Sequence, residues 1–165
     1  MRKYQFVAIG SNLPGPRGAS PLATCEEAAG RLAGLPGVQS ACRSRWFSTA
    51  PVPASSQPRY INGMVRLVCN LPAEALLAAC QAIEARAGRV RGAPDAARTL
   101  DLDVIDMAGL IRAAPDPILP HPRAHLRAFV LLPLRDVAPD WVHPVLGIGI
   151  SRFIEALPPQ DIFPL

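Results

Sequence analysis

The sequence predicts an α+β fold in which helices cover the faces of an antiparallel sheet. Four segments have the alternating or β-branched pattern of strands, and two longer segments space their apolar residues as helices do. These segments follow one another in the order strand, helix, strand, strand, helix, strand. That βαββαβ order is typical of the ferredoxin-like sandwich, so we expect a single domain of this kind over residues 1–165, with C-terminal additions.

The first half of the chain holds four of these elements. The first strand is expected over Tyr4–Ile9, which ends in a turn rich in glycine and proline. A helix is expected over Pro21–Gly34, because a serine can cap it and a proline suits its first turn. Strands are expected over Val38–Trp46 and Tyr60–Cys69. The Pro-, Ser- and Ala-rich residues 48–59 between them predict a long loop, which is more often functional than accidental.

The second half of the chain supplies the remaining elements. A helix is expected over Pro72–Ala87, with the glycine that follows as its stop. Residues 100–105 alternate apolar and acidic side chains and then turn β-branched, which predicts a strand, and a turn leads from it to a short partner around residues 110–111. Residues Arg127–Val137 are expected to be helical except at their proline, and a short helix is expected over about Ser151–Leu157.

The composition favours a globular protein with a small anionic ligand. Half of the residues are apolar, and the net charge is +4. Lys3 is the only lysine among the 17 basic residues, so the lysine-containing phosphate loop of P-loop enzymes is excluded. A basic chain favours a nucleotide or a nucleic acid, but aromatic residues make up only 5% of the chain, which is low for a base-stacking surface. We therefore expect small-molecule substrates and no nucleic-acid partner.

The cysteines and the N-terminal residues predict a cytoplasmic protein. The four cysteines are widely spaced in apolar contexts, so we expect reduced core thiols and not a zinc site. These residues are Cys25, Cys42, Cys69 and Cys80. A zinc ion at His121 and His125 would need a third ligand, and none is suitably spaced. No apolar run is long enough for a membrane, and no signal peptide precedes the first strand, so neither a membrane nor export is expected.

The stretch from Gly88 to Asp103 carries the clearest chemical pattern. Asp101 and Asp103 alternate with apolar residues, so both carboxylates should project from one face of a strand, with Cα atoms roughly 7 Å apart. Upstream arginines flank a Gly/Ala/Pro loop. Carboxylates that hold a metal beside arginines that bind phosphate oxygens are what phosphoryl transfer from a nucleotide requires. The same pattern also fits a solvated edge strand beside a loosely paired basic loop, because D-x-D is short and common.

Seven blocks of residues extend this pattern along the chain in order. They are Ile9-Gly10-Ser11-Asn12-Leu13, Ser48-Thr49-Ala50-Pro51-Val52, Gln57-Pro58-Arg59-Tyr60-Ile61-Asn62, Ile83-Glu84, Gly88-Arg89-Val90-Arg91, Arg98-Thr99-Leu100-Asp101-Leu102-Asp103, and Leu119-Pro120-His121-Pro122-Arg123 continuing through Arg127-Ala128-Phe129-Val130-Leu131. Together they resemble the successive motifs of the 6-hydroxymethyl-7,8-dihydropterin pyrophosphokinases of folate synthesis. The resemblance spans about Phe6 to Asp140, and the fold of that family is the ferredoxin-like sandwich.

The resemblance implies transfer of pyrophosphate from ATP to the hydroxymethyl group of the pterin, with release of AMP. Asp101 and Asp103 resemble the carboxylates that hold two Mg²⁺ ions on the ATP phosphates. Arg89 and Arg98 resemble catalytic arginines that clamp those phosphates. The other matching ATP-binding positions are Gln81, Glu84, Arg91, His121 and Arg127, although Gln81 equally fits an exposed polar helix face.

The same resemblance implies a pterin site. Tyr60 and Phe129 match stacking positions, and Asn62 can pair with the donors and acceptors of the pterin edge. Thr49 and Val52 match loop positions whose backbone contacts the ring. The alternatives are a core role for Phe129 and an amphipathic strand end for Tyr60.

The chain also departs from the family pattern. Ala97 precedes Arg98 where the family usually has proline, and Asp95 adds negative charge near the phosphate path, which should weaken nucleotide binding. Pro53 follows Val52 at a position where glycine is common in the family, and this proline should stiffen the loop over residues 48–59. Two other functions fit parts of the sequence, namely a ferredoxin-like RNA-binding module and a different metal-dependent nucleotidyl or glycosyl transferase that uses D-x-D.

Overall fold

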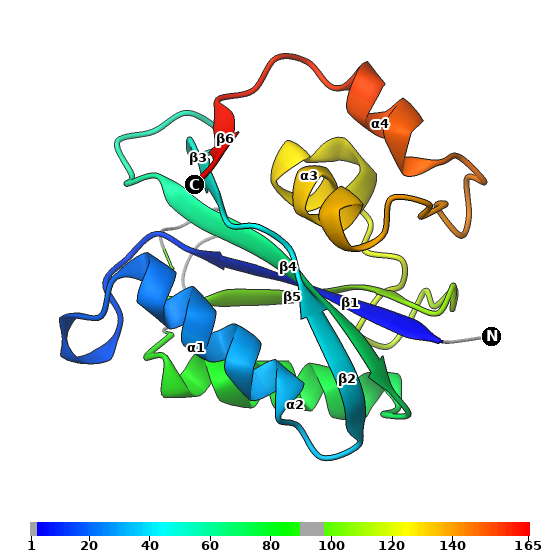
Figure 1. Cartoon of the computed structure of the whole chain (residues 1–165), viewed down its shortest axis with the longest axis horizontal. Helices are drawn as coiled ribbons and strands as arrows, with labels where there is room; N and C mark the ends of the chain where they lie inside the picture. Colours follow the sequence, from blue (N-terminus) through cyan, green and yellow to red (C-terminus); the bar gives the residue numbers. More distant parts are fainter. Residues whose placement is uncertain (1–2, 90–97) are drawn as a thin grey trace.

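The computed structural model describes residues 3–89 and 98–165, and the strands within them form one sheet (Figure 1). The strand order is β5-β1-β4-β3-β6, and β2 pairs with β4 beside β3. All pairings are antiparallel. The strands are β1 (Tyr4–Ser11), β2 (Val38–Arg43), β3 (Phe47–Thr49), β4 (Tyr60–Cys69), β5 (Asp101–Met107) and β6 (Ile162–Pro164).

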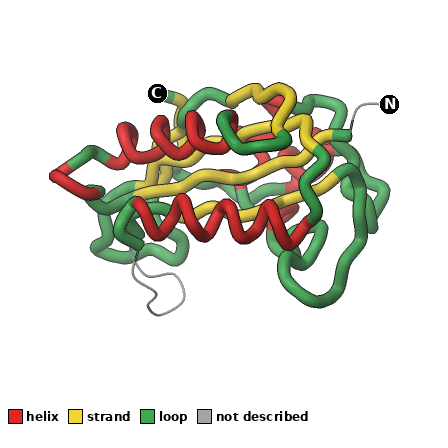
Figure 2. Tube along the Cα trace, turned by 90° about the horizontal axis from the view of Figure 1, so that it is seen from below, coloured by secondary structure: helices red, strands yellow, loops and turns green. Residues whose placement is uncertain are grey.

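Helices cover both faces of this sheet. On one face lie α1 (Pro21–Ala33) and α2 (Ala73–Arg86), which run alongside the strands in Figure 2. The other face is covered by α3 (Ala128–Val137), and α4 (Ile150–Ala156) packs against α3. The chain order β1-α1-β2-β4-α2-β5 and the spatial order β5-β1-β4-β2 are those of the predicted βαββαβ sandwich. No helix in the described part of the chain combines the length and apolar character needed to cross a membrane.

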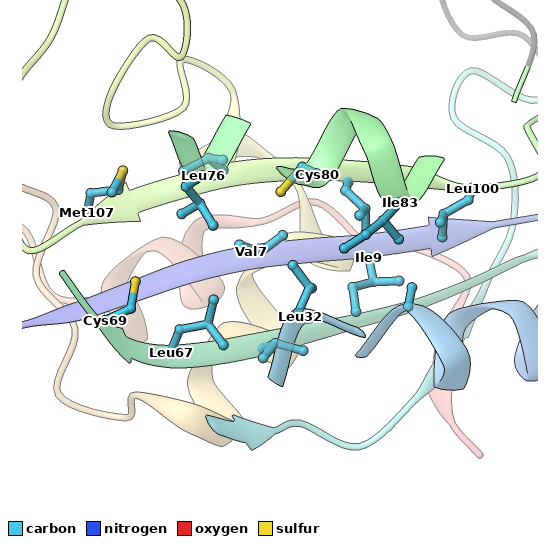
Figure 3. Close-up of a cluster of buried hydrophobic side chains, with 14 of the residues drawn as sticks. Val7, Ile9, Leu32, Leu67, Cys69, Leu76, Cys80, Ile83, Leu100 and Met107 are labelled. Atoms are coloured by element: carbon cyan, nitrogen blue, oxygen red, sulfur yellow. The ribbon is translucent and has the colours of Figure 1, made fainter. Parts of the chain in front are cut away.

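The core beneath α1 and α2 follows from the alternation of side chains along the strands. Val7 and Ile9 of β1 and Leu67 of β4 point to this side, where they meet fully buried leucines of both helices (Figure 3). Leu76 of α2 is one of them. Full burial of a side chain of this size contributes about 1.5–3 kcal/mol, so this layer supplies much of the stability that holds the strands in register.

The intervening strand residues point to the opposite face and form a second core beneath α3. Phe6 of β1, Met64 of β4 and Ile105 of β5 are buried there against Leu131 and Leu134 of α3. This second core ends near Ala128, the first residue of α3. The strand residues that continue the face in that direction are small, polar or acidic, and they form the candidate active site.

The predicted strand Val38–Trp46 was wrong in its second half. β2 ends at Arg43, and the chain then leaves the regular strand because Trp46 turns inward and its ring lies on Gly63 of β4, where a Cβ atom would overlap it. Ser44 holds the bend, since its hydroxyl accepts from the Met64 N–H at 2.9 Å. The expected loop over residues 48–59 begins later than predicted, because Phe47–Thr49 forms β3 between β4 and β6.

Smaller differences concern the C-terminal half and the cysteines. The partner expected near residues 110–111 is an isolated bridge between Arg112 and Leu119, after a turn at residues 108–109. The helix α3 runs through Pro133, which is buried on its apolar face, so the interruption expected at this proline does not occur. The strand β6 was not predicted. All four cysteines are free, as expected, but Cys42 is exposed on the edge strand β2 and is not a core thiol.

Candidate active site

A cavity of about 490 Å³ opens on the sheet face beyond the start of α3. Its floor is formed by β1, β4 and β5, and its walls by the segment after β3 and by the residues that lead into α3. The lining residues are Ala8, Ile9, Gly10, Thr49, Ala50, Pro51, Val52, Pro53, Gln57, Tyr60, Asn62, Arg98, Asp101, Asp103, His121, Pro122, Arg123, Arg127, Phe129 and Val130. The cavity therefore collects residues from six separate parts of the chain.

The central strand β1 makes room for polar side chains from its neighbours. Gly10 pairs with Asn62 of β4 on one side and with Asp101 of β5 on the other, and Ala8 pairs with Asp103. A Cβ atom on Gly10 would lie 2.8 Å from Oδ1 of Asn62, closer than such contacts normally are. Glycine and alanine on β1 thus leave space in which the Asn62 amide and both carboxylates project over the floor.

Asp101 and Asp103 share one face of β5, as predicted, but their surroundings differ. Asp101 accepts a hydrogen bond from Arg89 and is ion-paired with Arg98, each at 2.9 Å. Asp103 is half-buried, and the desolvation of its carboxylate, followed by the nearby charges of Asp101 and Glu84, raises its pKa to about 7. Burial disfavours the charge of Arg98, but the two aspartates outweigh it and raise the pKa of the guanidinium. The site therefore joins an acidic pair to a firmly charged arginine.

Glu84 supports this arrangement from behind the floor. The side chain is buried on α2, accepts from the backbone N–H of Leu102 at 3.0 Å, and is ion-paired with Arg89. Burial raises the pKa of Glu84, while the Leu102 N–H and Arg89 act in the opposite direction. Because Leu102 lies between the two aspartates, Glu84 fixes both the strand that carries them and the arginine that pairs with Asp101.

The wall opposite β5 is basic. Arg123 and Arg127 line the cavity, and Arg127 lies over the ring of Phe129 at 5.3 Å. Burial, and then the charge of Arg127, lowers the pKa of His121, so its imidazole is neutral near pH 7. Nδ1 of His121 accepts from the backbone N–H of Arg123 at 3.2 Å, which assigns the proton to Nε2 and makes that atom a donor. The N-terminus of α3 adds a further preference for anions.

The residues with stacking and hydrogen-bonding character lie at the β3–β4 end of the cavity. Nδ2 of Asn62 donates to Oγ1 of Thr49 at 2.6 Å, which holds the buried amide in one orientation. The Tyr60 hydroxyl donates to Oε1 of Gln57 at 3.3 Å. Phe129 is partly buried against the second core and also lines the cavity. Val52 is 63% exposed at the rim.

The structure brings most of the predicted site residues to one cavity. Those that line it are Thr49, Val52, Tyr60, Asn62, Arg98, Asp101, Asp103, His121, Arg127 and Phe129. Arg89 and Glu84 lie behind the acidic pair and reach it through hydrogen bonds. Gln81 is exposed on α2 and does not line the cavity. Arg91 lies outside the described residues.

Three polar residues of this region were not predicted. Gln57, Arg123 and the buried Asn12 belong to the sequence blocks quoted above, but Gln57 and Arg123 each adjoin a proline and Asn12 follows Gly10-Ser11, so all three have the character of turn residues. Asn12 and Gln57 turn out to be hydrogen-bonded to each other across 45 residues of sequence. Only their position inside ordered blocks could have indicated a role at the site.

The donor set suits a magnesium ion that also binds substrate. Among residues 3–89 and 98–165, no group of three or more His, Cys, Asp or Glu side chains could hold a metal. Magnesium does not require one, because it is commonly bound by one or two carboxylates together with substrate phosphates and water. The two aspartates of β5 provide this arrangement. His125, considered above for zinc, instead packs against the ring of His143, with centroids 5.0 Å apart.

Comparison with known proteins identifies the family. Residues 6–139 match the family described as 7,8-dihydro-6-hydroxymethylpterin-pyrophosphokinase (HPPK). The chain belongs to the HPPK family. Two relatives are named 2-amino-4-hydroxy-6-hydroxymethyldihydropteridine pyrophosphokinase. The one from Pseudomonas aeruginosa is 38% identical over 157 residues, or 95% of this chain and 93% of the relative. The one from Methylorubrum extorquens is 34% identical over 95% of both chains.

Other HPPK relatives are longer proteins. The folic acid synthesis protein fol1 of Pneumocystis carinii is 32% identical over 160 residues, which are 97% of this chain but 21% of that protein. A crystal structure of an HPPK-DHPS protein in complex with substrates superimposes with a TM-score of 0.66. The superposition covers 94% of this chain and 43% of the other chain at 12% identity, a likeness that shows the fold alone. The ferredoxin-like prediction is therefore confirmed.

Membership of the HPPK family decides the reaction. The enzyme transfers pyrophosphate from ATP to the hydroxymethyl group of 6-hydroxymethyl-7,8-dihydropterin and releases AMP, a step of folate biosynthesis. The predicted activity, its substrates and ATP as co-substrate are thus confirmed, and the alternative of another D-x-D transferase is wrong.

Proposed function

We propose that the enzyme binds ATP along β5 and the start of α3, and binds the pterin at the β3–β4 end of the same cavity. The observation that carries this assignment is the separation of two chemistries over one floor. Asp101 and Asp103 lie on β5, where Arg98 pairs with Asp101. Asn62 and Tyr60 lie on β4, on the other side of β1, and hydrogen-bond Thr49 and Gln57. A pyrophosphate donor and a flat heterocycle require these two kinds of surroundings, side by side.

Asp101 and Asp103 are the residues that we propose hold two Mg²⁺ ions. Cations beside them would offset the burial and mutual repulsion that raise the pKa of Asp103. When bound, Mg²⁺ would neutralise charge on the ATP phosphates and align the attacking and leaving oxygens. Glu84 keeps Arg89 and β5 in place for this purpose, which gives it a positioning role on the nucleotide side.

Arg98, His121 and Arg127 are proposed to bind the phosphates directly. Arg98 already lies 2.9 Å from Asp101, so its planar guanidinium can contact a carboxylate and a phosphate oxygen together. His121 is neutral and offers Nε2–H as a donor without adding charge to the basic wall. The hydroxymethyl oxygen attacks the β-phosphorus and releases its proton, the bond from that phosphorus to the α–β bridging oxygen breaks, and AMP leaves with that oxygen. Fixed donors around the transferring group stabilise its charge during this step.

Tyr60 and Phe129 are proposed to contact the faces of the pterin, and Asn62 its edge. The hydrogen bond from Asn62 to Thr49 fixes the amide before substrate arrives, so little ordering is required on binding. Val52 and its neighbours at the rim complete the wall on this side. We further propose that the enzyme is cytoplasmic, which suits four free thiols, and that it has no nucleic-acid partner.

Enzyme assays with matched variants test this assignment. AMP formation should depend on both Mg²⁺ and the hydroxymethyl pterin, and Asp103→Asn should lower turnover about a hundredfold or more. Asp140→Asn is the control, because Asp140 is an exposed aspartate outside the cavity. Titration calorimetry should show weaker pterin binding in Asn62→Ala and unchanged ATP binding. Loss of ATP binding with intact pterin binding in that variant would reverse the two subsites, and ATP consumption without pterin would contradict the reaction.

A further inference from the structure

Asn12 is buried at the end of β1, behind the cavity, and its amide joins two parts of the chain that are distant in sequence. Only 1% of the residue is exposed, and it does not line the cavity. Its Nδ2 donates to Oε1 of Gln57 and to the carbonyl oxygen of Pro58, each at 3.1 Å. Its Oδ1 accepts from the backbone N–H of Arg98 at 2.9 Å. The Asn12 side chain therefore connects the loop before β4 to Arg98, which lies shortly before β5.

The backbone around Asn12 strengthens its link to the Arg98 side. The N–H groups of Asn12 and Leu13 both donate to the carbonyl oxygen of Arg98, at 3.0 and 3.2 Å. The Ser11 hydroxyl donates to the carbonyl oxygen of Thr99 at 2.6 Å. Both backbone polar groups of Arg98 are thus held by residues 12–13, so the position of its guanidinium beside Asp101 depends on this segment.

The link to Tyr60 passes through an acceptor atom that Asn12 and Tyr60 share. Oε1 of Gln57 receives the Asn12 amide at 3.1 Å and the Tyr60 hydroxyl at 3.3 Å. Gln57 and Tyr60 both line the cavity, whereas Asn12 does not. The hydrogen bonds therefore connect Arg98, through one buried amide, to a glutamine and a tyrosine on the β4 side of the floor.

We infer that Asn12 is a positioning residue that couples the two substrate subsites. The inference rests on the proposed function, because it takes Arg98 as a phosphate ligand and Tyr60 as a pterin ligand. Phosphates that fix Arg98 also fix Gln57 and Tyr60 through Asn12, so nucleotide binding prepares the pterin side. Such coupling is reciprocal, and pterin must strengthen nucleotide binding by the same factor.

The geometry explains why asparagine is needed at this position. The amide faces one N–H group with its oxygen and two carbonyl-type oxygens with its nitrogen. Aspartate keeps the acceptor for Arg98 but has no donor for Gln57 or Pro58, so it preserves one half of the link and breaks the other. A serine side chain is too short to reach both Arg98 and Gln57, so Asn12→Ser removes both connections.

The test measures the dissociation constant of the pterin with and without α,β-methylene ATP and Mg²⁺, since this analogue cannot be cleaved at the reacting bond. The coupling factor is the ratio of the two constants. We expect about tenfold in the wild type and about twofold or less in Asn12→Asp and Asn12→Ser, within the usual range of coupling between sites. Ser11→Ala is the matched control. It removes a buried hydrogen bond from the adjacent residue and lowers stability, but leaves the link to Gln57 intact, so it should keep the wild-type factor.

Each outcome decides the inference. A merely structural role for Asn12 would lower both affinities together and leave the coupling factor unchanged, which would overturn the proposal. A wild-type factor near one would also overturn it. If an Asn12 variant does not fold, Gln57→Leu breaks the same link at a half-buried position, and a retained factor in that variant refutes the coupling. Failure of the proposed subsite assignment is separate, because Asn62→Ala would then lose ATP binding and keep pterin binding.

Discussion

Replacing Asp103 by Asn should make the metal-free protein more stable while it removes activity. Burial, and then the charges of Asp101 and Glu84, raise the pKa of Asp103 from its usual 3.8 to about 7. A folded-state pKa above the unfolded one means that the native protein holds this proton more tightly than the unfolded chain does. The ionised side chain therefore lowers stability as pH rises, and the full cost is present above about pH 7.

The magnitude follows from the size of this shift. One pKa unit corresponds to about 1.4 kcal/mol, so a rise of roughly three units sets an upper limit of about 4 kcal/mol at pH 8. Relaxation and water entry around a buried charge reduce such costs, and we expect the free energy of unfolding of Asp103→Asn to exceed that of the wild type by about 1–3 kcal/mol at pH 8. The difference should shrink below pH 7 and vanish below about pH 3, where Asp103 is protonated in both states.

Urea and thermal unfolding in the presence of a chelator at pH 8, 6 and 4.5 measure this difference. Asp140→Asn serves as the control, because that exposed aspartate should show no comparable gain. Addition of Mg²⁺ should reduce the difference in free energy of unfolding between the variant and the wild type, since the ion stabilises the folded wild type and not the variant. A variant that is less stable than the wild type at pH 8, or a gain that is equal at all three pH values, would refute the argument that burial strains this carboxylate.

Three further predictions concern the floor and the wall of the cavity. Asp101→Asn should lower turnover about a hundredfold or more, with little change in unfolding free energy, and near-normal turnover would remove this residue from the proposed metal site. Gly10→Ala should displace the Asn62 amide, because the added Cβ would lie 2.8 Å from Oδ1, and should raise the pterin KM about tenfold with less effect on the ATP KM. Phe129→Ala should weaken pterin binding in calorimetry and spare ATP, while an equal loss for both ligands would indicate a general collapse of the wall.

The fold was largely predictable, because its central elements carry their own local signals. The bounds of β4 agree with the prediction residue for residue, since alternation of apolar side chains runs along the whole strand. The break between β2 and β3 was not predictable from local pattern. It depends on the inward turn of Trp46 onto Gly63, a contact with another strand. The strand β3 in turn gains its second partner from Ile162–Pro164, more than a hundred residues later in the chain.

The candidate site shows the same division between local and distant causes. The acidic pair of β5 follows from a short alternating pattern, and the ordered blocks indicated which other residues to expect nearby. The burial of Glu84 could not be read from α2 alone, because it depends on the Leu102 N–H of a strand that comes later in the chain. The same holds for Asn12, whose neighbours in sequence are turn residues and whose partners lie 45 to 86 residues away.

The position of the cavity follows from where α3 begins. Along β4 the residues on this face change from Met64, buried beneath α3, to Asn62 and Tyr60, and along β5 from Ile105 to Asp103 and Asp101. The alternation that builds the second core therefore also builds the site, and the start of α3 at Ala128 divides the two. Because α1 and α2 pack against the other face of the same strands, the sheet can hold a half-buried carboxylate and a buried amide in place. Polar groups that lower stability are thus held where a substrate and its metal can stabilise them.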